Sequence, residues 1–444
     1  MQIKRIKTKE KVIFLLDMDA FFASCHVARD PSLKDKNLVV ASPNRRAIIT
    51  TASYNARKFG IKAGMPIFKA EELCKNIYRV DSDFALYIKY SQMVFDVIYK
   101  NFSQKIEVAS IDECYIDVTH VWKKYGTAKK CAIVLKNMVY EKTGLTCSIG
   151  ISSNKFLAKS CVDFNKPNGV SILLPKDIDK VLWPLEVKEM FMVGKATEEV
   201  FLKNNIFTIK DLAQSDVNKI YELLGKRGLT LWSWANGYGS DIVEKDENEF
   251  KSIGNEFTLN YTTTDTKEIE EMIYELSLKI CDRANKRFLK GKTISIILKY
   301  ENEKNYNFNA TEHKKHKHHQ AGLEQYTAEV EKVYSVAKNC FYNTWTGEPI
   351  LLIGVRLSNL IDDINDKKQL SLGDVNLYER TNLNDIQKII YDLELKFGTK
   401  KIFTGDKLIK YNKKNRGQSK YLENDDVHIS NKQVVAKWSK EKKD

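Results

Sequence analysis

Residues 12–19 read Val-Ile-Phe-Leu-Leu-Asp-Met-Asp, an apolar run that ends in two acids separated by one residue. An aliphatic run of this length predicts a fully buried β-strand. Side chains alternate along a strand, so Asp17 and Asp19 are expected to share one face. The segment therefore predicts a buried strand with carboxylates at its end.

Helical and strand patterns alternate from this segment to residue 173. Strand patterns occur at 39–51, where a turn follows, at 147–151, and in a hairpin at 106–118 with its turn near Ser110–Glu113. Helical patterns occur at 21–29, 54–59, 85–102 and 128–143. Ser152 or Ser153 is expected to cap a further helix that runs to about residue 163. Interleaved strands and helices predict one α/β unit over residues 12–173.

Between residues 175 and 240 the strand patterns stop, and a small helical domain is expected. Residues 188–212 read helix, glycine turn at Gly194 and helix, as in a helix-hairpin-helix, whose turn amides can bind a DNA phosphate. Met192 stands where the common form of that motif has its first glycine. An ordinary helical hairpin explains the pattern equally well.

The polar, acidic segment 242–251 is a predicted linker. Beyond it we expect strand, helix, strand, strand, helix and strand, at 253–259, 267–288, 293–300, 306–311, 328–344 and 350–357. This βαββαβ order predicts a split-βαβ domain. Residues 363–444 form a basic extension with one helical stretch at 383–397, and their sequence leaves open whether they fold.

The charge of the chain suggests a polyanionic partner. Its 444 residues, enough for several domains, carry a net charge of +14. Half of this surplus lies in residues 367–444, and residues 286–319 contribute +6. Nucleic acid is the first candidate and an acidic membrane surface the second, with a general enrichment in lysine as the alternative.

The sequence argues against several other classes of protein. Its longest apolar runs have five residues, whereas a membrane span needs roughly 18. No long apolar segment follows the basic N-terminus, so a secretion signal is not expected. The eight cysteines form no Cys-x-x-Cys pair and often lie in apolar runs, which predicts buried, reduced thiols in a cytoplasmic protein and argues against zinc.

Two acidic groups carry the expected chemistry. The first is Asp17-Met-Asp19, and the second is Ser110-Ile-Asp-Glu113 at the hairpin turn. Carboxylates at the ends of adjacent strands can hold two divalent ions, which activate a 3′-hydroxyl and stabilise a pyrophosphate leaving group. Magnesium suits such oxygen ligands. For an isolated Asp-x-Asp pair, solvated surface acids would be the simpler interpretation.

Five motifs follow one another along the chain: Asp17-Met-Asp-Ala-Phe-Phe-Ala23, Ser53-Tyr-Asn-Ala-Arg-Lys-Phe-Gly60, Ala109-Ser-Ile-Asp-Glu113, Gly150-Ile-Ser-Ser-Asn-Lys-Phe-Leu-Ala-Lys159 and Asn165-Lys-Pro-Asn-Gly169. Together, over residues 12–360, they resemble the Y-family translesion DNA polymerases of the DNA polymerase IV-like branch. The resemblance implies a multidomain α/β and α+β fold of right-hand shape. Its parts would be palm (1–19 and 84–173), fingers (20–83), helical thumb (174–241), βαββαβ little finger (252–362) and the extension (363–444).

The resemblance also implies the activity and its metal ligands. The expected protein is a template-directed DNA polymerase that performs low-fidelity translesion synthesis by two-magnesium nucleotidyl transfer, without proofreading. Asp17, Asp112 and Glu113 match the magnesium carboxylates of the family. Met18 would contribute only its backbone carbonyl, so that its side chain could vary, and Asp19 would only support Asp17.

Further residues match positions that contact the nucleotide in the family. Tyr54 and Arg57, which share a helical face, and Lys166 match contacts to the incoming triphosphate. Phe22 matches the steric gate that excludes a ribose 2′-hydroxyl, although a core aromatic is the alternative. By position, Ile48 and Thr50 could lie over the templating base, where modest side chains would leave room for damaged bases.

The implied partners are primer–template DNA and deoxynucleoside triphosphates, bound by a monomer. Gln369-Leu-Ser-Leu372 resembles a motif that docks on the sliding clamp, but Gly373 replaces the usual Phe and a chance tetrapeptide is equally plausible. In His313-Lys-Lys-His-Lys-His-His319, the lysines favour a solvated DNA-facing loop over a metal site.

Two alternative interpretations of the sequence are possible. A non-catalytic relative that kept the fold would be expected to have lost part of the acidic set, which is complete here. A generic basic nucleic-acid-binding protein would explain the charge but not the five motifs.

Overall fold

The computed structural model describes residues 11–43, 47–244, 250–300 and 316–362. The chain divides into two compact units between Asn248 and Glu249. This division falls inside the segment 242–251. The clamp motif at Gln369–Leu372, Gly373 and the strand predicted at 306–311 lie outside the described residues.

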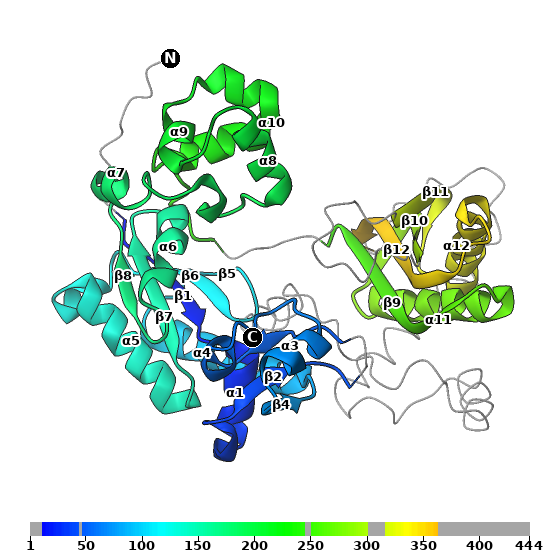
Figure 1. The fold of residues 1–444 in the computed structure, drawn as a ribbon, viewed down its shortest axis with the longest axis horizontal. Helices are drawn as coiled ribbons and strands as arrows, with labels where there is room; N and C mark the ends of the chain where they lie inside the picture. The colour runs from blue at the N-terminus through cyan, green and yellow to red at the C-terminus, as the bar shows by residue number, and fades with distance from the viewer. Residues whose placement is uncertain (1–10, 44–46, 245–249, 301–315, 363–444) are drawn as a thin grey trace, which may run out of the picture. The chain divides into compact units, whose positions relative to one another are not determined.

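A five-stranded sheet forms the centre of the first unit, and the strand β1 (Ile13–Met18) is its middle strand (Figure 1). The antiparallel neighbours of β1 are β6 (Glu113–Asp117) and β7 (Cys147–Ser152). The short strands β5 (Ile106–Val108) and β8 (Val170–Ile172) form the edges. The predicted buried strand and the predicted hairpin are confirmed.

Helices cover both faces of this sheet. The helices α4 (Phe84–Asn101) and α5 (Ala128–Thr143) pack on the face that carries Phe14 and Leu16. The helix α6 (Lys155–Val162) packs on the other face, where Leu15 contacts Ala158. Because side chains alternate along a strand, Asp17 lies on the same face as Leu15 and α6.

Two local features fix α6 in place. Its N-cap is Asn154, whose side-chain oxygen accepts a hydrogen bond from the Leu157 amide at 2.9 Å. The prediction of a serine cap is wrong, because Ser152 still belongs to β7 and its hydroxyl donates to the Leu173 carbonyl. A Cβ at Gly150 would lie 2.1 Å from the Ala158 carbonyl oxygen, so glycine is required where α6 crosses β7.

Residues 21–80 form a small insertion between β1 and α4. The insertion begins with α1 (Phe21–Arg29) and the 3₁₀ turn η1 (Pro31–Leu33). A three-stranded sheet has the order β3 (Thr51–Ala52), β2 (Asn37–Val40) and β4 (Ile77–Val80). The helices α2 (Tyr54–Arg57) and α3 (Ile67–Leu73) pack on it around a core of small and aliphatic residues such as Val39, Ile49 and Ala56.

Residues 175–240 are helical, as predicted. Their elements are η4 (Pro175–Asp177), α7 (Ile178–Val181), η5 (Val187–Glu189), α8 (Lys195–Lys203), α9 (Ile209–Gln214) and α10 (Val217–Ala235). The helix expected before Gly194 is only the 3₁₀ turn η5. Met192 has a φ of 71°, the left-handed conformation that usually favours glycine. The turn therefore keeps a glycine-like backbone shape despite its methionine.

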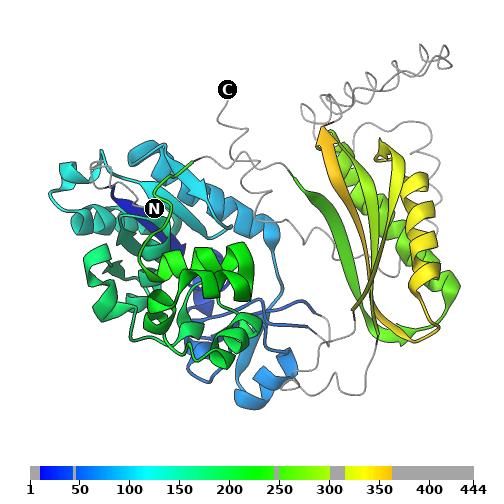
Figure 2. The same cartoon turned by 90° about the horizontal axis from the view of Figure 1, so that it is seen from above.

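The second unit has the predicted βαββαβ order. Its elements are β9 (Ser252–Thr263), α11 (Thr266–Asn285), β10 (Leu289–Tyr300), β11 (His316–Thr327), α12 (Val330–Thr344) and β12 (Ile350–Asp362). The strands form one antiparallel sheet in the order β11, β10, β12 and β9, with both helices on one face (Figure 2). Residues 316–319 begin β11, so the prediction of a loop is wrong for this part of the histidine cluster, whereas 313–315 lie outside the described residues.

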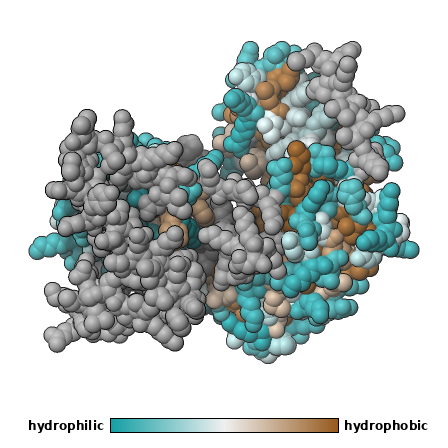
Figure 3. Space-filling model, turned by 180° about the vertical axis from the view of Figure 1, so that it is seen from behind, coloured by the Kyte–Doolittle hydropathy of each residue, from teal (hydrophilic) through white to brown (hydrophobic). Residues whose placement is uncertain are grey.

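The eight cysteines are all buried and free of disulfides, as the sequence predicts. Apolar residues on the visible described surface are scattered among hydrophilic ones (Figure 3). Within the described ranges, none of the helices combines the length and apolarity that a membrane crossing requires.

Candidate active site

Asp17 lies at the centre of the candidate site because its strand is the middle strand of the sheet. Across β1 and β6 it is paired with Glu113, and across β1 and β7 with Ser148. Residues directly opposite each other in antiparallel strands project from the same face. The register therefore places two carboxylates and a hydroxyl side by side on the face that α6 covers.

Asp112 joins this group from the hairpin turn before β6. Its backbone carbonyl accepts a hydrogen bond from the Met18 amide at 3.0 Å, which ties the turn to the end of β1. The Ser110 hydroxyl donates to the Asp112 carboxylate. The Met18 side chain is buried in the hydrophobic core, an environment that favours apolar side chains of similar size.

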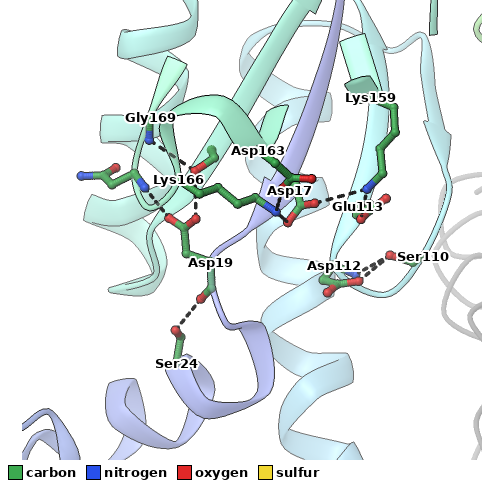
Figure 4. A network of polar contacts seen from close by, with 12 residues as sticks. Asp17, Asp19, Ser24, Ser110, Asp112, Glu113, Lys159, Asp163, Lys166 and Gly169 are labelled. Atoms are coloured by element: carbon green, nitrogen blue, oxygen red, sulfur yellow. Dashed lines mark hydrogen bonds and ion pairs between the residues drawn. The ribbon is translucent and has the colours of Figure 1, made fainter. Parts of the chain in front are cut away.

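Two lysines hold the carboxylates in this structure (Figure 4). The Lys159 ammonium, on α6, lies 2.5 Å from Glu113 Oε1 and 3.5 Å from Asp17 Oδ2. The Lys166 ammonium lies 2.8 Å from Asp17 Oδ1 and 2.7 Å from Asp163 Oδ1. Each of the two oxygens of Asp17 thus faces a positive charge.

The pKa values of the acids and of the lysines are all raised, for different physical reasons. Burial, followed by the charge of Asp17, raises the pKa of Glu113 to about 7. Burial likewise raises the pKa of Asp112. Burial alone would lower the pKa values of the two lysines. Their carboxylate partners outweigh burial, so Glu113 raises the pKa of Lys159 and Asp17 raises the pKa of Lys166. The site therefore favours added positive charge.

The donor set fits divalent magnesium. The three acids offer hard oxygen ligands, which magnesium prefers, and two ammonium groups already occupy positions among them. In the described part of the chain, no three His, Cys, Asp or Glu side chains yet converge on one point. The ion pairs of Lys159 and Lys166 with the carboxylates would have to open before metal ions could replace the two ammonium groups.

The other predicted nucleotide contacts lie near this group. Tyr54 begins α2, and its hydroxyl lies 3.5 Å from Asp19 Oδ1. The Arg57 guanidinium lies 4.8 Å from the centre of the Tyr54 ring, so the two residues share a face as predicted. Arg57 is exposed, and its Nε donates to the Ala52 carbonyl. Tyr54 and Arg57 therefore present a phenol and a guanidinium from the inserted domain.

Phe22 differs in its surroundings from the neighbouring Phe21. Phe21 is buried in the core, whereas Phe22 is partly exposed. The ring of Phe22 stacks on Tyr87 with centroids 4.2 Å apart and lies 5.9 Å from the ring of Phe84. The ring is thus supported by Tyr87 and remains partly exposed. Ile48 and Thr50 are both exposed.

The structure adds residues that the sequence did not single out. Lys159 stands inside one of the five motifs, and its place on the face of α6 above Asp17 could have suggested a role. Ser148 carries no motif signal, because only the pairing of β7 with β1 brings it to the site. Its hydroxyl donates to Asp19 Oδ1 at 2.8 Å.

Comparisons with known proteins identify relatives of this chain. Residues 16–163 match the impB/mucB/samB family, and residues 250–372 match the C-terminal domain of that family. DNA polymerase IV of Oceanobacillus iheyensis is 34% identical over 396 residues, which cover 88% of this chain and 90% of that protein. DNA polymerase IV 1 of Bacillus subtilis is 32% identical and covers 93% of this chain and 96% of its own length.

A solved structure supports the same relationship. A Y-family DNA polymerase chimera of Dbh and Dpo4 superposes with a TM-score of 0.69 at 27% identity. The superposition covers 79% of this chain and 99% of that chain. These relatives and the fold define a DNA-directed DNA polymerase. The chain belongs to the Y family of translesion DNA polymerases, in the DNA polymerase IV-like branch.

Proposed function

We propose that this polymerase extends a primer past damaged template bases by two-magnesium nucleotidyl transfer, with low fidelity and without proofreading. The observation that carries the proposal is the placement of Asp17, Asp112 and Glu113 at the same end of the sheet, where Lys159 and Lys166 form ion pairs with Asp17 and Glu113. We assign these acids, with the Met18 backbone carbonyl, as the ligands of the two ions. When bound, the ions would activate the primer 3′-hydroxyl and neutralise charge on the leaving pyrophosphate.

The side chains around the acids suit the binding of a triphosphate. Arg57 offers a planar fork of donors that matches phosphate oxygens, and Tyr54 offers a hydroxyl beside it. Lys166 is the third contact that we propose, because its ammonium lies next to Asp17 and could exchange this partner for a phosphate. Phe22, supported by Tyr87, would exclude nucleotides that carry a ribose 2′-hydroxyl.

We propose the right-hand arrangement for the domains. The five-stranded sheet with its helices would be the palm, the insertion the fingers, the helical segment the thumb and the second unit the little finger.

In the second unit, Ile296 and Leu298 lie in the core under the helices, so the alternate residues Ser295 and Lys299 face the other way. Arg356 is paired with Ser295 on this side of the sheet, where Ser295 is buried and the Arg356 side chain is partly exposed. Lysine and arginine contacts to DNA phosphates would make binding fall steeply with salt.

A further part of the proposal rests on residues outside the described ranges. We propose that Gln369, Leu370 and Leu372 dock on the sliding clamp. We also propose that the protein is monomeric and located in the cytoplasm. A clamp pull-down comparing the wild type with Leu370→Ala plus Leu372→Ala tests the docking. Equal recovery of both proteins would remove the hypothesis.

Primer extension with magnesium tests the proposed chemistry. The wild type is compared with Asp112→Asn, which keeps the shape of the side chain but loses a charged ligand. Asp96→Asn is the matched control, because Asp96 lies on α4 in an ion pair with Lys100 away from the site. We expect extension by the wild type and the control and none by Asp112→Asn. Extension by all three proteins would contradict the site, and extension by none would contradict the activity.

A further inference from the structure

Asp19 is a buried carboxylate to which the proposed chemistry gives no task. Its side chain is only 2% exposed. A buried charge is strongly unfavourable unless hydrogen bonds compensate it. Three donors do so here: the Asn168 amide at 2.8 Å from Oδ2, the Ser148 hydroxyl at 2.8 Å from Oδ1, and the Tyr54 hydroxyl at 3.5 Å from Oδ1. These partners connect Asp19 to two segments that carry proposed triphosphate contacts.

The first of these segments is the loop Asn165–Gly169, which carries Lys166. Asn168 has a φ of 56°, a left-handed conformation that is uncommon for residues with a Cβ. Asp19 holds its amide, and the Lys136 ammonium donates to its carbonyl. The Gly169 amide donates to the Ser148 hydroxyl at 3.3 Å, and this hydroxyl is itself bonded to Asp19. Asp19 and Ser148 therefore fix two successive amides of the loop.

The second segment is the start of α2. The hydroxyl of Tyr54 points at Asp19, and burial together with the nearby Asp19 charge raises the pKa of this phenol to about 12. The phenol therefore stays protonated and can donate to the carboxylate. The Asp19 side chain thus contacts both Tyr54, from the insertion, and the loop Asn165–Gly169, from the sheet domain. These two segments are far apart in the sequence.

The backbone of Asp19 is held as firmly as its side chain. Its amide donates to the Thr146 carbonyl at 3.0 Å, and its carbonyl accepts from the Ser24 hydroxyl at 2.6 Å. In Figure 4 the carboxylate points toward the loop that carries Gly169, and away from Asp112. An ionised carboxylate has about four lone-pair positions, and three donors occupy three of them here. Asp19 is therefore built to hold the protein chain and not a metal ion.

We propose that Asp19 is a positioning residue for the incoming nucleotide. It sets the distance between Tyr54 and the loop of Lys166, so that both can reach one triphosphate. The inference rests on the proposed function, because it takes these two residues as triphosphate contacts. Loss of the Asp19 carboxylate should weaken nucleotide binding far more than it slows the chemical step.

Single-turnover primer extension with Asp19→Asn tests the proposal. The variant keeps the size of the side chain, but its amide nitrogen must face one of the two strong donors. We expect the Kd of the deoxynucleoside triphosphate to rise at least about tenfold, as loss of a hydrogen bond to a charged group predicts. The maximal rate should stay within about threefold of the wild type, because the three proposed metal ligands are intact. Nucleotide binding to the enzyme on a dideoxy-terminated primer with Ca²⁺ repeats the measurement without catalysis.

Two further variants separate positioning from general damage. Ser148→Ala removes one donor and should raise the same Kd by a smaller factor, and it carries the test if Asp19→Asn does not fold. Because both residues hold one loop, the double variant should be less impaired than the product of the single effects. Ser24→Ala is the matched control, since it loses a hydrogen bond to the Asp19 backbone but leaves the carboxylate intact, and it should bind nucleotide normally.

The possible failures are distinct. An unchanged Kd in both Asp19→Asn and Ser148→Ala would overturn the positioning role. Loss of the maximal rate with an unchanged Kd would place Asp19 with the metal ligands instead. Failure of the wild type itself to bind nucleotide or extend a primer would overturn the proposed function and, with it, this inference.

Discussion

The loop Asn165–Gly169 leaves no room for a side chain at its last residue. A Cβ added to Gly169 would lie 1.8 Å from the Asn165 carbonyl oxygen, whereas real Cβ atoms essentially never approach closer than 3.0 Å. In Gly169→Ala the loop must therefore open by more than about 1 Å, and Lys166 lies inside the displaced segment. A misplacement of about 1 Å can lower catalysis roughly 100-fold. We expect kcat/KM for nucleotide insertion to fall by about this factor.

Steady-state insertion of a single nucleotide measures the effect, with circular dichroism as a check on folding. Gly322→Ala is a matched control, because no atom lies within 4 Å of a Cβ added at Gly322. The control should insert nucleotides at the wild-type rate. A folded Gly169→Ala protein with kcat/KM within threefold of the wild type would refute the argument that this loop sets nucleotide affinity.

Three other predictions concern the neighbouring side chains. Phe22→Ala should raise ribonucleotide insertion in a single-turnover assay, and unchanged sugar discrimination would exclude the steric gate. The same variant should lower the free energy of unfolding by about 2 kcal/mol, because the ring that stacks on Tyr87 is only partly buried. Lys159→Met should strengthen Mn²⁺ binding at pH 8.5, because the ion no longer competes with an ammonium group between Glu113 and Asp17. Electron paramagnetic resonance measures the binding. Weaker Mn²⁺ binding would show that Lys159 helps to hold the site open. Since burial raises the pKa of Glu113 to about 7 and only its ionised form binds metal, apparent Mg²⁺ affinity should rise with pH up to about 7 and then level off, whereas a flat profile between pH 5.5 and 8 would contradict this assignment.

Local patterns were enough to predict the elements that carry the acids. The apolar run before Asp17 has five residues, a length that favours a buried strand over a helix, and the alternation around Ser110–Glu113 is typical of a hairpin. The βαββαβ order followed from the same periodicities, because each of its elements buries one face against a common core. These patterns single out the two acidic clusters, whereas the proposed roles of Asp17, Asp112 and Glu113 come from the family resemblance.

Contacts between distant segments lay beyond such patterns. Ser148 reaches Asp19 only because β7 pairs with β1 in one register, and a slip by one residue would turn its hydroxyl to the other face. At the start of β11, from His316, the charged and histidine side chains give a pattern typical of a solvated loop, although the segment is a strand. The capping error at α6 has a similar cause, since the pairing of β7 with β1 extends to Ser152 and shifts the cap to Asn154.

The central place of β1 in its sheet has a consequence for the synthesis of the protein. The ribosome makes this strand first, but its partners β6 and β7 follow roughly 95 and 130 residues later, which at 5–20 residues per second means many seconds. During that time a bare apolar strand exposes both edges, a situation that promotes aggregation. Charged residues next to such a strand oppose misassembly. Asp17, in the strand, and Asp19, just after it, place two such charges beside this apolar run.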